Sequence, residues 1–166
     1  ADIAAGNRWN LAFILLVLGR PAEGDEVVRG VKAYGDLSMS YPIYMERYDE
    51  ARSGIERMLR SSRATGDVWA EMHMTRNLAI VDLWQGRFSA ARAGAARSLA
   101  MAEPIGAPNG IAFNLSVLAW LAAVEGRESE ARESAARADD LVQRGAGLRL
   151  VQARLRATLG LLELGL

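Results

Sequence analysis

A short sequence pattern returns at a fixed interval and constrains how this chain can fold. The segment GRFSAAR at 86–92 recurs as GRESEAR at 126–132, and ERYDEAR at 46–52 precedes both, with Glu in the glycine position. Each copy follows an apolar helical segment and opens an amphipathic one. A fixed period of about 40 residues is typical of chains built from stacked helix pairs.

The glycines at 86 and 126, taken as turns within helix pairs, set the positions of the other elements. The sequence predicts an all-α chain of about eight helices, over residues 7–18, 25–43, 48–65, 68–85, 89–103, 109–125, 128–144 and 148–164. These helices should form repeat units over residues 1–23, 24–66, 67–107, 108–147 and 148–166. The first predicted helix would be the second member of an incomplete pair, and Pro42 should kink or end the next one.

Residues 1–166 are interpreted as one helical-repeat domain and as a fragment of a longer protein. Helical solenoids need polar capping helices at their ends, whereas residues 159–166 are nearly all apolar. The apolar run at 11–18 is much shorter than a membrane-spanning helix, which needs roughly 20 residues. We therefore expect a buried helix there, no membrane association and a cytoplasmic location.

Charge and composition argue against several classes of function. The chain carries 20 basic and 20 acidic residues, and a domain that holds nucleic acid through phosphates normally has a basic excess. It has no cysteine and a single histidine, His73, so disulfides and the common metal-ligand sets are not expected. No cofactor is expected in this segment, and no direct contact with nucleic acid.

Catalytic motifs do not emerge from the sequence either. Residues 19–24 have the GxxxxG spacing of a phosphate loop, but Asp25 and Glu26 follow where Lys and Ser or Thr are required. An enzymatic site would have to centre on His73 with a neighbouring carboxylate, and no strained nucleophile turn is apparent. The sequence therefore predicts a chain that is not an enzyme.

The repeats resemble tetratricopeptide repeats in the pattern Gly-Arg-aromatic-x-x-Ala. Leu78-Ala79 before Gly86 and Leu118-Ala119 before Gly126 match the pair that usually precedes the turn. Leu159-Gly160 matches if the next turn glycine lies just beyond the end of the chain. The resemblance implies an α-solenoid of antiparallel helix pairs. Its helices should be longer than usual, because the period exceeds the ordinary one of about 34 residues.

The amino-acid sequence of the later repeats makes the resemblance to one protein family more specific. Segments 126–132, 145–146 and 157–165 look like the helical-repeat region of ATP-binding LuxR-type (MalT-like) bacterial transcriptional regulators. In that group a nucleotide-binding module precedes the repeats and a DNA-binding helix-turn-helix follows them, so ATP would bind to another domain of the parent protein. The resemblance covers about residues 48–166. Similar repeats also occur in bacterial adenylate cyclases, kinases and other signalling ATPases.

In repeats of this type the first helix of each pair lines the concave surface, which implies a set of ligand-binding positions. We expect the ligand or partner to contact His73, Arg76, Ile80, Phe113, Ser116, Trp120 and Arg154. Counting back from the turn glycine of each repeat gives these positions. The same count also places on this face Leu83, Ala123, Ala157, Leu161 and Leu164. Aromatic area beside arginine suits a peptide or an amphipathic small molecule. Alternatively, the two aromatic residues are core residues at helical spacing and the arginines are solvated.

Asp82 occupies a position that is usually apolar in these repeats. A buried carboxylate needs a partner, which Arg52, Arg92 or Arg132 would supply from a neighbouring helix. An exposed position on a solvated helix face is the alternative.

Two functions from different classes remain open. The first is a non-catalytic regulatory module that binds a protein, a peptide or a small-molecule inducer, as the sensor or interaction arm of a LuxR-type regulator. The second is a self-associating scaffold segment of another signalling protein, such as a cyclase or kinase, in which the apolar ends at 11–18 and 159–166 join copies into a homo-oligomer.

Overall fold

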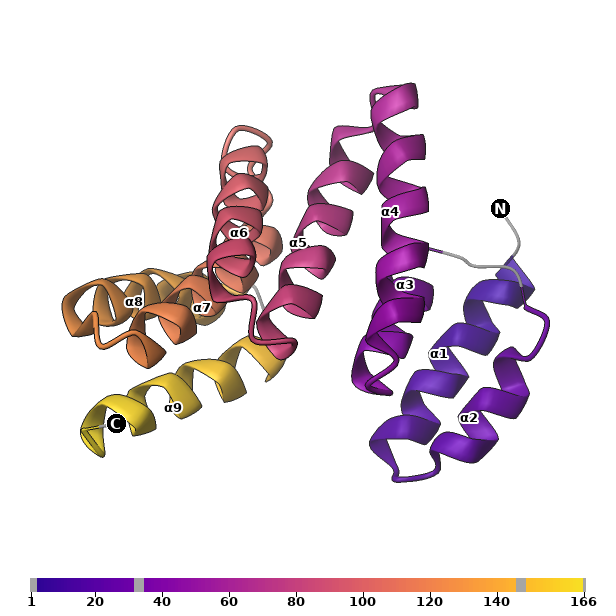
Figure 1. Cartoon of the computed structure of the whole chain (residues 1–166), viewed down its shortest axis with the longest axis horizontal. Helices are drawn as coiled ribbons and strands as arrows, with labels where there is room; N and C mark the ends of the chain where they lie inside the picture. The colour runs from indigo at the N-terminus through magenta and orange to yellow at the C-terminus, as the bar shows by residue number, and fades with distance from the viewer. Residues whose placement is uncertain (1–2, 32–34, 146–148, 166) are drawn as a thin grey trace.

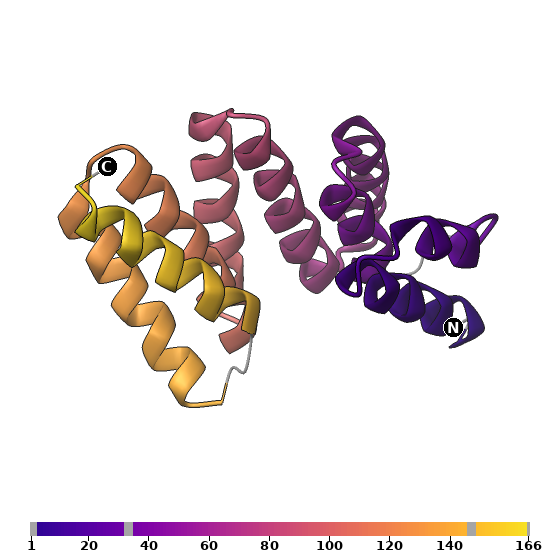
Figure 2. The ribbon, with the colours of Figure 1, turned by 90° about the horizontal axis from the view of Figure 1, so that it is seen from below.

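The chain is all-helical, which confirms the predicted fold class, in a computed structural model that describes residues 3–31, 35–145 and 149–165. The helices of these residues are α1 (Ile3–Val17), α2 (Pro21–Val28), α3 (Gly35–Tyr44), α4 (Tyr48–Thr65), α5 (Val68–Trp84), α6 (Phe88–Ala102), α7 (Pro108–Val124), α8 (Glu128–Gln143) and α9 (Arg149–Glu163). Four helix hairpins, α1–α2, α3–α4, α5–α6 and α7–α8, lie side by side, and α9 follows them (Figures 1 and 2). This arrangement is compatible with the expected helical repeats.

One turn geometry joins the two helices of each hairpin. Gly19, Gly86 and Gly126 all adopt left-handed backbone conformations, with φ values of 73°, 73° and 72°. The arginine after each glycine donates its N–H to the carbonyl five residues earlier at 2.8 Å. This is the Schellman motif, which satisfies the free carbonyls at a helix end and favours glycine at the left-handed position. The GxxxxG spacing at 19–24 therefore begins with a hairpin turn.

Glu46 takes the place of the turn glycine between α3 and α4. Its φ is +58°, the one positive φ at a non-glycine residue among those the structure describes. The N–H of Arg47 donates to the carbonyl of Pro42 at 2.9 Å, as in the other hairpins. The turn therefore keeps its geometry although a side chain is present, and the left-handed conformation of a non-glycine residue costs about 1–2 kcal/mol.

Replacing Glu46 with glycine is expected to raise the free energy of unfolding by about 0.5–1 kcal/mol. Glycine removes the steric cost of the left-handed backbone, although it gives the unfolded chain more freedom. Gly86→Glu is the reciprocal change and should lower stability by about 1–2 kcal/mol. Urea unfolding followed by circular dichroism measures both, and a Glu46→Gly variant less stable than the wild type contradicts this account of the turn.

The predicted single helix over 25–43 is wrong. The chain forms two helices there, α2 and α3, and Gly30 adopts a left-handed φ of 70° just after α2 ends. The helix predicted over 7–18 is α1, and it is the first helix of a pair with α2 instead of the second helix of an incomplete pair. Pro42 lies near the end of α3, and the helix ends soon after it, as expected for a residue without a backbone N–H.

The last helix also ends close to a left-handed glycine. Gly165 has a φ of 67° and donates its N–H to the carbonyl of Leu162 at 3.2 Å, as Gly126 does to Ala123 at 3.0 Å. Gly165 follows Leu159 by six residues instead of the expected eight. The predicted helix start at 148, the loop residues 146–147 and residue 166 of the apolar run lie outside the described residues.

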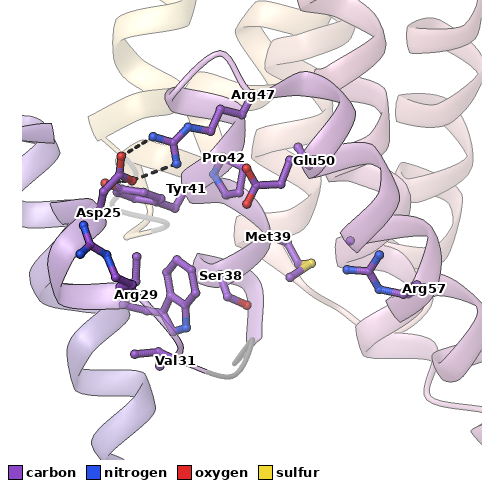
Figure 3. Close-up of a pocket in the computed structure, with 14 residues that line it drawn as sticks. Asp25, Arg29, Val31, Ser38, Met39, Tyr41, Pro42, Arg47, Glu50 and Arg57 are labelled. Carbon is purple, nitrogen blue, oxygen red and sulfur yellow. Dashed lines mark hydrogen bonds and ion pairs between the residues drawn. The ribbon is translucent and has the colours of Figure 1, made fainter. Parts of the chain in front are cut away.

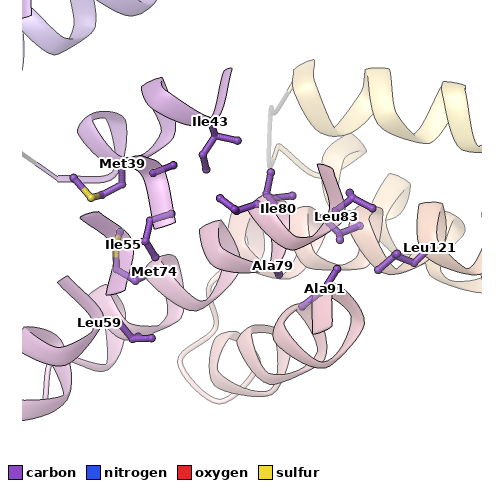
Figure 4. Packing of buried hydrophobic residues seen from close by; sticks show 14 residues of the cluster. Met39, Ile43, Ile55, Leu59, Met74, Ala79, Ile80, Leu83, Ala91 and Leu121 are labelled. Carbon is purple, nitrogen blue, oxygen red and sulfur yellow. The ribbon is translucent and has the colours of Figure 1, made fainter. Parts of the chain in front are cut away.

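Small residues let the helices approach closely at matched positions. Ala51, Ala91 and Ala131 stand one repeat interval apart in α4, α6 and α8, and all three are buried. The largest apolar cluster runs from α3 to α7, with Ile55 of α4 and Leu121 of α7 fully buried (Figure 4). The core is therefore a continuous layer between neighbouring hairpins.

Asp82 forms a structural ion pair, as one of the two interpretations predicted. It is 7% exposed, and its Oδ1 accepts hydrogen bonds from Arg52 Nη2 at 2.5 Å and from Arg87 Nε at 2.8 Å. Arg92 and Arg132, which stand one and two repeat intervals after Arg52, bind glutamates instead. Each of these arginines reaches from the second helix of one pair to the end of the next first helix.

Candidate functional site

Two adjoining pockets lie along the first helices of the pairs. One of about 350 Å³ is lined by α1, α3, α5, α7 and α9, and one of about 200 Å³ by α5, α7 and α9. Leu150 lines both pockets. We call the two together the first-helix groove, and its lining residues are Phe13, Ser40, Ile43, Tyr44, His73, Arg76, Asn77, Ile80, Leu83, Trp84, Asn109, Phe113, Trp120, Leu150, Arg154 and Ala157. None of them comes from a second helix.

The structure brings all seven predicted site residues together at this groove. Six of them line it: His73, Arg76, Ile80, Phe113, Trp120 and Arg154. The seventh, Ser116, is buried behind the lining and accepts a hydrogen bond from Arg154 Nη1 at 3.0 Å. Of the other positions counted to this face, Leu83 and Ala157 line the groove, whereas Ala123 is buried in a core cluster with Ala122 and Ala131. Leu161 and Leu164 line neither pocket.

Two arginines contact the ring of Phe113 at the centre of the groove. The Cζ atom of Arg76 is 4.6 Å from the ring centroid, and that of Arg154 is 4.7 Å from it. These three residues come from α5, α7 and α9, so the cation–π contacts join three first helices. Arg76 is only 8% exposed and donates from Nε and Nη2 to Asn77 Oδ1 at 3.3 and 3.1 Å. The interpretation of Arg76 as solvated is therefore wrong, whereas Arg154 is partly buried.

Arg154 is a partly buried cation whose contacts are with neutral groups. Burial lowers the pKa of Arg154 to about 10, while Tyr44 raises it and Arg76 lowers it by smaller amounts. Its hydrogen bond goes to the hydroxyl of Ser116 and its ring contact to Phe113. Among the residues that the structure describes, no carboxylate forms an ion pair with it. The side chain stays charged at neutral pH, in a place where charge is poorly solvated.

Sequence reasoning missed the part of the groove that α1 and α3 supply. Ser40 and Ile43 stand one repeat interval before Ile80 and Leu83, so the same count would have found them. The expected continuous helix over 25–43 hid this relation. Tyr44, at the end of α3, meets Phe13 of α1 edge to face, with ring centroids 5.4 Å apart.

A separate pocket of about 440 Å³ lies between the first two hairpins, and Asp25 and Arg47 on its wall form an ion pair (Figure 3). Arg47 donates from both Nη atoms to the carboxylate of Asp25, the Nη1 contact measuring 2.9 Å. Tyr41 donates its hydroxyl to the same carboxylate at 3.3 Å. The hydrogen bonds from Arg47 hold the pKa of Asp25 below its usual value. We interpret this cluster as a structural link between α2 and the α3–α4 turn.

Metal-binding side chains, membrane-spanning helices and similarity to known proteins would each indicate a function. Within the described residues, no three histidine, aspartate or glutamate side chains gather as a metal-binding set. None of the helices traced there is both long and apolar enough to cross a bilayer. No protein-family model, curated protein or solved structure matches this chain. The features of the chain that point to a function are therefore its sequence repeats and the first-helix groove.

Proposed function

We propose that this chain is a non-catalytic regulatory module that binds a ligand or partner in the first-helix groove. The observation that supports this most is that eight of the twelve positions counted from the repeats line one groove. The combined cavity has an apolar and aromatic lining with a few polar groups, the composition of small-molecule and peptide sites. Binding there would shift the equilibrium between two arrangements of a larger protein.

The resemblance of the repeats to those of LuxR-type regulators supports a more specific setting. In this setting the chain is the sensor or interaction arm of a cytoplasmic bacterial transcriptional regulator, and other domains bind ATP and DNA. The reading frame on both sides of the segment tests this. A phosphate-loop motif upstream with a helix-turn-helix downstream supports the assignment, and a cyclase or kinase domain overturns it.

A groove-filling substitution tests the binding function. Ala157 is exposed and lines the smaller pocket with Leu83 and Trp120, so Ala157→Trp should fill that pocket without disturbing the core. The matched control is Ala96→Trp, at an exposed position of α6 outside the groove. The wild type and the control should bind the apolar dye N-phenyl-1-naphthylamine saturably, and Ala157→Trp should bind it at least about tenfold more weakly, a difference of about 1.4 kcal/mol.

Dye fluorescence titrations give the three dissociation constants. Equal dissociation constants for Ala157→Trp and the wild type would show that the dye binds elsewhere, and would contradict the proposal. A loss in both tryptophan variants would contradict it as well, because the control leaves the groove open.

The alternative, a self-associating scaffold, is favoured by exposed apolar side chains near the two ends of the chain. Leu11, Ile14 and Leu18 are exposed at α1, and Leu164 is exposed after α9. Light scattering over a range of concentrations decides between the two functions. A mass that rises with concentration, and no longer rises in Ile14→Glu, supports the scaffold; a monomer at all concentrations rules it out.

A further inference from the structure

We propose that the ligand of the first-helix groove carries an anionic group that binds Arg154 and an apolar body that covers Leu83 and Trp120. The anionic group would be a carboxylate, a phosphate or a sulfonate, since all three present paired oxygens to a guanidinium. This inference rests on the proposed function, because it names the class of ligand for the same groove.

The charge of Arg154 has no counter-ion among the residues that the structure describes. A guanidinium has five N–H donors, and the structure accounts for one of them in the hydrogen bond to Ser116. Arg154 is partly buried, so water solvates its charge less well than on the open surface, and this desolvation lowers its pKa. An anion from the ligand would supply both the missing charge and acceptors for the remaining donors.

The rest of the described groove lining brings no negative charge to Arg154. None of the lining residues that the structure describes is an aspartate or a glutamate. Arg76 and Arg154 both contact the Phe113 ring, with their guanidinium carbons 4.6 and 4.7 Å from its centroid. An anion bound beside Arg154 would therefore meet no carboxylate among the described lining residues. The groove therefore favours a negative ligand over a positive one.

An apolar wall lies beside Arg154. The smaller pocket is completed by Leu83, Trp84, Trp120 and Leu150, together with the methyl group of Ala157. These side chains offer area but no charge, so they suit the hydrocarbon or aromatic part of a ligand. An anionic group and an apolar body thus match adjacent parts of one cavity of about 200 Å³.

Two dyes that share one skeleton test the inference. 1-Anilinonaphthalene-8-sulfonate carries a sulfonate, and N-phenyl-1-naphthylamine has the same rings without it. The wild type should bind the sulfonate at least about tenfold more tightly, the difference that one charge-assisted contact of about 1.4 kcal/mol gives. Arg154→Gln should abolish this preference, because it should weaken binding of the sulfonate dye at least about tenfold more than binding of the neutral dye. Arg156→Gln, an exposed arginine two residues along α9, should keep the preference.

Each outcome separates this inference from the proposed function. A sulfonate preference that persists in Arg154→Gln overturns the anion site, while loss of neutral-dye binding in Ala157→Trp still supports the groove. Both dyes binding Ala157→Trp as tightly as the wild type would sink the proposed function itself. If Arg154→Gln binds neither dye, Arg154→Lys decides: a retained preference for the sulfonate supports the inference, and equal affinity for the two dyes overturns it.

Discussion

Replacing Gly94 with valine is expected to lower the free energy of unfolding by about 3 kcal/mol, because the site leaves no space for a side chain. Gly94 lies in α6 against α5, and a Cβ atom built on it would come within 2.9 Å of the Cβ of Ala79 and 3.4 Å of its Cα. The obstacle is partly backbone, so α5 and α6 would have to separate. At this chain length the loss corresponds to a fall in Tm of roughly 6–12 °C.

Gly160→Val is the matched control for this substitution. Gly160 is also within a helix, α9, but nothing lies within 4 Å of an added Cβ. Glycine and valine are both weak helix formers, so the control should change stability by less than about 0.5 kcal/mol. Urea unfolding followed by circular dichroism compares the two, and equal losses would contradict close packing of α5 on α6.

Truncating Leu121 to alanine is expected to cost about 2–5 kcal/mol, since it leaves a cavity in the main core. The side chain is 0% exposed and belongs to the cluster that joins α3, α4, α5, α6 and α7 (Figure 4). Leu11→Ala removes the same atoms from a side chain that is 45% exposed, and should cost less than about 0.5 kcal/mol. Similar losses in the two variants would show that the core does not lie where the structure places it.

The repeated turn explains why the middle of the fold was predictable. The helix predicted over 48–65 matches α4 at both ends, and those predicted around Gly86 and Gly126 begin and end within one residue of α5 to α8. The glycine and the arginine after it set the turn locally, so their recurrence fixes the helix ends without knowledge of the packing.

The N-terminal region departed from prediction because the interval changes there. The step from Gly19 to Glu46 is shorter than the two equal steps from Glu46 to Gly86 and from Gly86 to Gly126. A prediction that assumes the longer interval places one helix where the chain forms α2 and α3, and it does not pair α1 with α2. The left-handed Gly30 was the signal for the break, and a lone glycine in a polar segment is a weak one.

Repeat position predicted which face of each helix meets the groove, but not how the side chains combine there. The contacts of Phe113 with Arg76 and Arg154 depend on how α5, α7 and α9 pack, which a count along one helix does not contain. The same holds for Tyr44 and Phe13, which reach the groove from the region where the interval fails.

The most direct test of the central claim, that ligands bind in the first-helix groove, is a titration that follows the four tryptophan indole N–H signals by NMR. Trp84 and Trp120 line the groove, Trp69 lies beside His73, and Trp9 lines the pocket between the first two hairpins. With 1-anilinonaphthalene-8-sulfonate as the probe, the signals of Trp84 and Trp120 should shift saturably while that of Trp9 stays in place. A shift of Trp9 with Trp84 and Trp120 unchanged would contradict the account.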